Sequence, residues 1–158
     1  MIYALSDIHG CLDALEDALA RIGDLDDILT PDSDNMLIFL GDYVDGGPES
    51  ASVLCRIHEL QQRYPDNVIV LKGNHDDWLL DFLTTDEPLF TVTFTEETLC
   101  SFLPASVIDS FSGIGSFEVL PAIRTYILEH YPWLVGWLRS LPLYFKTETQ
   151  VFVPRRYR

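Results

Sequence analysis

The fold is decided by a stretch near the start of the chain, Ile2-Tyr3-Ala4-Leu5-Ser6-Asp7-Ile8-His9-Gly10, in which an apolar run ends in carboxylate and imidazole side chains. The pattern recurs twice, in Met36-Leu37-Ile38-Phe39-Leu40-Gly41-Asp42-Tyr43-Val44-Asp45-Gly46-Gly47 and in Val68-Ile69-Val70-Leu71-Lys72-Gly73-Asn74-His75-Asp76. Short apolar runs bounded by glycine and polar residues indicate buried strands. Three strands that each end in polar, metal-ligating side-chain types predict one shared site.

Helical patterns separate these runs. Residues 11–22 place four leucine or isoleucine side chains at helical spacing, and a second helix opens near Pro48 and Ser50 and ends at Pro65. Residues 24–35 are acidic and predict a loop, and a third helix is expected over residues 76–83. The order β-α-β-α-β predicts an α/β protein with a parallel sheet and right-handed crossovers. In such sheets the ligand site lies outside the carboxyl ends of the strands, where all three polar motifs fall.

The rest of the chain has a different character. Residues 84–120 are rich in Thr, Ser, Phe and Leu without a sustained period, and we expect a partly helical cap over the mouth of the site. A helix over residues 121–138 is expected to break at Pro132, with Trp133 and Trp137 packed in the core or cap in preference to lining a substrate wall. Residues 149–153 predict a last strand.

These segments predict one domain over residues 1–158. Within it we distinguish a metal-binding half (1–83), a helical cap (84–140) and a last strand with a tail (141–158). The tail, Pro154-Arg155-Arg156-Tyr157-Arg158, is basic in an acidic chain, and we expect a frameshift, a premature stop or a truncated longer protein.

Composition limits the classes of partner. The formal net charge of −15 disfavours nucleic acid and anionic membranes, which require a positive surface. No apolar stretch approaches the ~18 residues of a membrane span, and no signal peptide is evident, so we expect a cytoplasmic protein. Cys11, Cys55 and Cys100 form no paired motif and are expected to be buried free thiols.

The polar motifs suit a pair of divalent cations. Asp7 and His9, two residues apart, can turn to the same side and supply oxygen and nitrogen to one cation. Asp42 could bridge two cations, and Asn74 offers an oxygen to the second. Mixed oxygen and nitrogen ligands suit Mn, Fe, Zn or Mg. Two such ions can hold a phosphoryl group and activate a water molecule.

A proton donor stands next to these ligands. His75 adjoins Asn74 and is suited to protonate a leaving group, while Asp45 could hydrogen-bond the imidazole and keep it oriented and protonated. Each motif alone is compatible with ordinary turn or helix-cap chemistry. The ordered occurrence of all three at strand ends is what favours a functional site.

Together the motifs resemble the opening motifs of calcineurin-like metallophosphoesterases. Within that family they are most similar to the phosphoprotein phosphatases, a branch with bacterial serine/threonine phosphatases and symmetrical diadenosine tetraphosphatases in it. The resemblance extends from Met1 to about Val153 and implies a metal-dependent phosphoesterase fold. It also implies a role for each polar residue: a first metal ion held by Asp7, His9 and Asp42, a second by Asp42 and Asn74, and His75 as the general acid supported by Asp45.

The chain departs from the family pattern at two places. The family has a phosphate-binding arginine where this chain has Gly46, so weaker substrate binding is expected. The family also closes its metal site with two later histidines. Here His58 is expected at a helix surface and His130 in a structural helical position, so neither is given a metal role. The second metal site is therefore expected to be incomplete, with the later strands of the family fold missing.

Three functions follow from these observations. The leading one is hydrolysis of phosphomonoesters by metal-activated water, on a phosphorylated protein or a small phosphoester. The second is symmetrical cleavage of a dinucleoside tetraphosphate. The third is a degenerate domain that binds metal or phosphate without catalysis, which Gly46 and the missing histidines favour. Loss of the later strands would expose a sheet edge, and self-association through that edge is expected.

Overall fold

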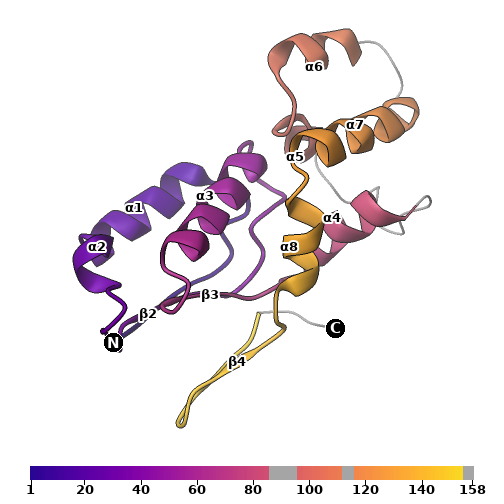
Figure 1. Cartoon of the computed structure of the whole chain (residues 1–158). Coiled ribbons are helices and arrows are strands. Elements are labelled where there is room, and N and C mark those ends of the chain that lie inside the picture. Colours follow the sequence, from indigo (N-terminus) through magenta and orange to yellow (C-terminus); the bar gives the residue numbers. More distant parts are fainter. Residues whose placement is uncertain (86–95, 112–115, 155–158) are drawn as a thin grey trace.

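A parallel three-stranded sheet lies at the centre of the protein. The computed structural model describes residues 1–85, 96–111 and 116–154. The strands are β1 (Ile2–Leu5), β2 (Met36–Phe39) and β3 (Val68–Val70), paired in that order (Figure 1). Ala4 pairs with Ile38, and Ile38 with Ile69, so the three carboxyl ends lie in register at one edge. The predicted parallel β-α-β-α-β arrangement is confirmed.

Two helices cover one face of this sheet. Helices α1 (Leu12–Ile22) and α3 (Ser50–Arg63) lie side by side on it (Figure 1). The strand order never reverses, and crossovers of the same hand, which are right-handed as a rule in parallel sheets, then place both helices on the same side. Leu15, Phe39 and Ile57 are buried in the hydrophobic core. Each such side chain contributes about 1.5–3 kcal/mol by leaving water, and truncating Phe39 to alanine would cost roughly 3–5 kcal/mol.

The segment predicted as a loop over residues 24–35 contains a short helix, α2 (Leu25–Ile28). The N-cap residue of α2 is Asp24, whose side chain accepts a hydrogen bond from the Asp26 backbone N–H at 3.0 Å. Aspartate is a preferred residue at this position because it satisfies a free amide of the first turn. The acidic composition that suggested a loop therefore marks a helix start.

Helices also fill most of the C-terminal half. Helix α4 (Asn74–Thr84) follows β3 and begins two residues before the predicted start. The expected cap contains α5 (Glu96–Cys100) and α6 (Ala105–Phe111), while residues 86–95 and 112–115 lie outside the described residues. Helices α7 (Ser116–His130) and α8 (Leu134–Ser140) are separated at Pro132, as expected. However, α7 begins five residues before Pro121, which lies inside it.

An aromatic cluster joins α3 to α8, and it corrects the placement of His58. The His58 ring stacks on Trp133 at 4.1 Å between centroids and meets Trp137 edge-on at 5.3 Å. Trp137 also donates to the Gln61 side chain at 2.7 Å. His58 is therefore half-buried and not a surface residue, because the flat imidazole packs as an aromatic ring. Both tryptophans have the packing role that was expected.

His130 is exposed near the end of α7. Its ring stacks on Tyr126 at 3.8 Å, and its Nδ1 lies 2.9 Å from the Tyr126 carbonyl.

The predicted free state of the cysteines is confirmed, but their predicted burial is wrong. Cys11 and Cys55 are exposed, and Cys100 is partly so.

A hairpin extends away from the helices (Figure 1). Its strands are β4 (Phe145–Lys146) and β5 (Val151–Phe152), which pair antiparallel. The predicted last strand is thus present but shorter, and its partner β4 was not predicted. Large apolar side chains remain exposed in and beside the hairpin: Leu143, Tyr144, Val151 and Val153. No helix among the described residues is long and apolar enough to span a membrane.

Candidate metal centre

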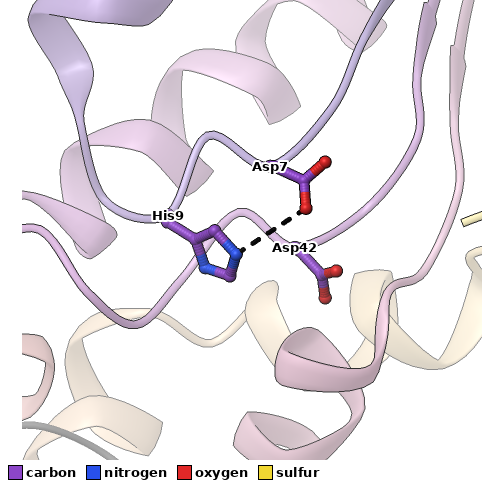
Figure 2. Close-up of side chains that lie close together, drawn as sticks. All are labelled: Asp7, His9 and Asp42. Atoms are coloured by element: carbon purple, nitrogen blue, oxygen red, sulfur yellow. Dashed lines mark ion pairs between the residues drawn. The ribbon is translucent and has the colours of Figure 1, made fainter. Parts of the chain in front are cut away.

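Two loops bring together three side chains that could hold a metal ion. Asp7 and His9 follow β1 and Asp42 follows β2, and one ligand atom from each lies within 4.8 Å of the others (Figure 2). The His9 Nε2 is 3.9 Å from Asp7 Oδ1. Asp42 is buried, whereas the side chains of His9 and Asp7 are 33% and 32% exposed. The group is therefore anchored inside the protein and open to solvent on one side.

The backbone at this site is held in unusual conformations. Asp7, His9, Asp42 and Asp45 have φ angles of 53°, 46°, 58° and 70°. No other non-glycine residue within the described ranges has a positive φ. Such conformations cost of order 1–3 kcal/mol each and persist only where surrounding contacts enforce them. Within the described ranges, the non-glycine residues with strained φ angles are thus the ones predicted to ligate metal or to support the proton donor.

Backbone hydrogen bonds between the two loops enforce these conformations. The His9 N–H donates to the Asp42 carbonyl at 3.0 Å, and the Gly47 N–H donates to the His9 carbonyl at 2.7 Å. Gly10, with φ of +68°, lies so close that an added Cβ would stand 2.5 Å from the Gly47 oxygen. Only glycine fits at position 10, and this close approach is what lets the loops converge.

One hydrogen bond determines which nitrogen of His9 is available to a metal ion. Its Nδ1 lies 3.0 Å from the Val44 carbonyl oxygen. A carbonyl only accepts, so Nδ1 carries the proton and Nε2 keeps its lone pair. A backbone carbonyl behind a histidine ligand is the usual way to orient the ring toward a metal. Ser6 similarly donates to Asp7 Oδ2 at 2.8 Å, leaving Oδ1 on the His9 side.

The donor set fits a divalent cation. Two carboxylates and one imidazole nitrogen are ligands that suit Mn, Fe, Zn or Mg. The carboxylates of Asp45 and Asp76 lie close behind them, so negative charge gathers here. That charge would repel a phosphate unless cations reversed the local field. The site residues are therefore consistent with metal binding and, without a cation, poorly suited to an anionic substrate.

His75 lies beside this group with the expected partner. Its Nδ1 is 3.1 Å from Asp45 Oδ2, and its ring meets the His9 ring edge-on at 4.9 Å. Asp45 is itself fixed by its N–H donating to Ser50 Oγ at 3.2 Å, and by Thr98 Oγ1 donating to its Oδ1 at 3.4 Å. The pairing occupies Nδ1 of His75, so Nε2 is the nitrogen available for proton transfer. Thr98 belongs to α5, which places the cap next to the site.

Asn74 is the first residue of α4, directly before His75. The His75 backbone N–H donates to Asp42 Oδ1 at 3.2 Å, so the start of this helix touches the ligand group. The structure thus puts Asn74 next to the other site residues, and its role as a ligand stays a prediction. Gly46 has φ of +108°, and an added Cβ there would stand 3.4 Å from the His9 Cβ.

Sequence reasoning missed two residues of the site. Asp76 is fully buried and accepts hydrogen bonds from the backbone N–H groups of Asp42, Tyr43 and Gly73 at 2.8, 2.9 and 2.8 Å. Burial raises its pKa to about 6, although the three N–H groups act in the opposite direction. Its position three residues after the helix cap was the available signal. Thr98 carried no signal, because nothing in the sequence connects it to Asp45.

Comparison with known proteins identifies relatives of this arrangement. A sequence model of the family described as calcineurin-like phosphoesterase matches residues 1–152. Symmetrical bis(5'-nucleosyl)-tetraphosphatases of Acidovorax sp. (strain JS42) and Acidovorax ebreus (strain TPSY) are each 44% identical to the chain over 79 residues. The match covers 50% of this chain and 25% of either relative, so the chain aligns with about a quarter of their length.

The fold has a counterpart among solved structures. A serine/threonine phosphatase from Saccharomyces cerevisiae with similarity to human PP5 superposes with a TM-score of 0.52. The sequence identity is 20%, and the superposition covers 90% of this chain and 33% of the yeast chain. At that identity the likeness concerns the fold alone. The resemblance and the fold class inferred from the three motifs are confirmed.

Proposed function

The chain belongs to the calcineurin-like phosphoesterase family, and on that premise we propose that it is a metal-dependent phosphoesterase acting on phosphomonoesters. One observation carries the proposal. A three-residue ligand group, Asp7, His9 and Asp42, lies directly beside a paired His75 and Asp45. Metal-ligating groups next to an oriented proton donor are the parts that hydrolysis of a phosphoester requires.

The metal ions are assigned to residues as follows. Asp7, His9 and Asp42 would hold the first divalent ion, and Asp42 with Asn74 would contribute to a second, less complete site. When bound, such ions neutralise phosphoryl charge and lower the pKa of water. Asp42 is suited to serve both, because its side chain lies between the β1 loop and the first turn of α4.

His75 would protonate the departing oxygen through Nε2. Asp45 accepts from Nδ1, which fixes the ring plane and stabilises the protonated imidazole before transfer. The side chains in this pair are 24% and 11% exposed, so the ring can reach a substrate while its partner stays protected. Gly46 supplies no charge to the phosphate, and substrate binding should therefore depend more on the metal ions than where an arginine is present.

Serine/threonine phosphoproteins and small phosphoesters are the substrate class we place first. Symmetrical dinucleoside tetraphosphates are the second candidate, favoured by the 44% identity to the Acidovorax tetraphosphatases over 79 residues. A non-catalytic, metal-binding domain is the third, and the glycine at position 46 favours it. The number and affinity of bound metal ions separate the third candidate from the other two. Two tightly bound ions would favour an enzyme, whereas no ion or one weakly bound ion would favour the non-catalytic domain.

The test is turnover of p-nitrophenyl phosphate, a phosphoserine peptide and diadenosine tetraphosphate, each with and without added Mn²⁺. We expect Mn²⁺-dependent release of phosphate from the first two. If two nucleoside diphosphates from the tetraphosphate were the main product, the second candidate would replace the first.

The decisive variant is Asp42→Asn, with Asp17→Asn as a matched control. Both changes remove one carboxylate without altering size, but Asp17 is exposed on α1. We expect Asp42→Asn to abolish turnover and Asp17→Asn to leave it unchanged. Turnover that survives Asp42→Asn, or wild-type protein that neither binds Mn²⁺ nor turns over any substrate, would reject the enzyme assignment.

A further inference from the structure

Asp76 makes more hydrogen bonds than a helix cap requires. A capping residue in its position needs to accept only from the amide at the start of its own helix, here Gly73. Its other two bonds reach the N–H groups of Asp42 and Tyr43, which are 34 and 33 residues away in the sequence. The carboxylate is fully buried between the two loops. Most of its bonding capacity therefore serves the loop after β2 and not its own helix.

The two distant bonds enclose the Asp42 backbone. The N–H of Asp42 precedes its Cα, and the N–H of Tyr43 follows it, so one carboxylate holds the peptide groups on both sides. These peptide groups determine φ and ψ of Asp42, whose φ of 58° is in the strained left-handed region. Asp76 is thus in a position to stabilise the conformation that directs the Asp42 side chain toward Asp7 and His9.

The same carboxylate ties Asp42 to the start of α4. Its third bond, to Gly73, fixes the residue before Asn74 and His75. The loops are in direct contact here, because a Cβ on Gly73 would stand 2.3 Å from the Asp42 nitrogen. A change in Asp76 would therefore be felt at Asp42 and at the first turn of α4 together.

We propose that Asp76 is a positioning residue of the metal centre, which holds the Asp42 backbone in its ligating conformation and couples it to the loop that carries Asn74 and His75. The inference rests on the proposed function. It assigns no contact between Asp76 and metal or substrate, since both of its oxygens are occupied by backbone amides.

A carboxylate is needed because three donors converge on this side chain. Asparagine has one acceptor oxygen, and its NH₂ group would face N–H donors. Asp76→Asn should therefore release at least one of the enclosing bonds. Residues that orient metal ligands typically change metal affinity 10- to 100-fold when mutated, and we expect a decrease of about that size. Asp76→Glu keeps both oxygens and should retain more of the affinity.

The control is Tyr43→Phe. The Tyr43 hydroxyl is equally buried in these loops, donating to the Leu71 carbonyl at 2.6 Å and accepting from the Gly41 N–H at 3.0 Å. The change removes buried hydrogen bonds nearby and leaves the three bonds of Asp76 intact. It should lower stability without the loss of metal affinity, which separates positioning from general destabilisation.

The experiment measures Mn²⁺ binding by titration calorimetry, and backbone amide exchange at Asp42, Tyr43 and Gly73 by NMR, on metal-free proteins shown to be folded. We expect Asp76→Asn to weaken Mn²⁺ binding 10- to 100-fold and to accelerate exchange at these three amides, with Tyr43→Phe near wild type in Mn²⁺ affinity. Equal Mn²⁺ affinity in Asp76→Asn and wild type would overturn the inference. If Asp76→Asn does not fold, Asp76→Glu decides by the same measurements: Mn²⁺ affinity below that of wild type together with accelerated exchange supports the inference, and Mn²⁺ affinity equal to that of wild type contradicts it. A wild type that binds no Mn²⁺ would instead contradict the proposed function, whatever the amides show.

Discussion

The loops after β1, β2 and β3 differ from the β4–β5 hairpin in a way that secondary structure would not suggest. The loops are irregular, yet Asp42, Asp45 and Asp76 are buried, and backbone bonds join one loop to another. The hairpin is regular, but it pairs two residues with two and leaves Tyr144 63% and Val151 60% exposed. Burial and hydrogen bonds between loops, and not regular secondary structure, therefore determine which segment is firmly packed in this protein.

The largest effect is expected at His75, because the proposed function makes this residue of the irregular loops the proton donor. Substituting His75→Ala should reduce turnover roughly 10²- to 10⁴-fold, the range for loss of a general acid. The reduction should be larger for phenyl phosphate than for p-nitrophenyl phosphate, whose better leaving group needs less protonation. Steady-state kinetics on both substrates measures this, with His130→Ala as an exposed control. Equal reductions on the two substrates would contradict the acid role.

Strain in the loops gives the second prediction. Gly46→Ala introduces a side chain at φ of +108°, and we expect a loss of about 1–2 kcal/mol in the free energy of unfolding. Gly136→Ala is the control, since Gly136 lies exposed within α8 and a Cβ added there would meet no atom within 4 Å. There alanine should stabilise by about 0.5–1 kcal/mol. Urea unfolding measures both, and a Gly46→Ala protein as stable as wild type or more stable would show that the loop is not strained at Gly46.

The hairpin gives a smaller expected effect on stability. Replacing Tyr144→Ser and Val151→Thr together should change the free energy of unfolding by less than about 0.5 kcal/mol per substitution, as is usual at exposed positions. Removal of this apolar surface should also shift a self-associated protein toward monomer. Analytical ultracentrifugation of both proteins checks the second effect. A cooperative loss of several kcal/mol would show that the hairpin is as firmly held as the loops.

The smallest effect is expected in the aromatic cluster, outside both regions. Burial lowers the pKa of His58, so its folded pKa lies below the unfolded value of about 6.5. The unfolded chain then binds more protons, and the stability contributed by His58 is present above that pH and lost as the pH falls below it. His58→Phe keeps a stacking ring that cannot titrate. In urea unfolding, the midpoint concentration of His58→Phe should fall less between pH 7.5 and pH 5.5 than that of wild type.

The sequence allowed prediction of much of the first 84 residues, because short apolar runs mark the strands, helical spacing marks the helices and glycines mark the turns. The parallel sheet, α1, α3 and the convergence of Asp7, His9 and Asp42 follow from those patterns. The hydrogen bonds that Asp76 accepts from Asp42 and Tyr43 could not be predicted, since they depend on how two loops meet in space. Strand β4 has two residues and hence no period to detect. The stack of His58 on Trp133 joins residues 75 positions apart in the sequence, beyond any local signal.

The distance in sequence between Asp42 and its support has a consequence for synthesis. Asp7, His9 and Asp42, the side chains that could hold a metal ion, are all translated by residue 42, whereas Asp76 follows 34 residues later. At a translation rate of about 5–20 residues per second, Asp76 is added roughly 2–7 s after Asp42. During this interval the hydrogen bonds from the Asp42 and Tyr43 N–H groups to Asp76 cannot form. Metal capture by the newly made protein is therefore expected to follow the emergence of Asp76 from the ribosome and not that of Asp42.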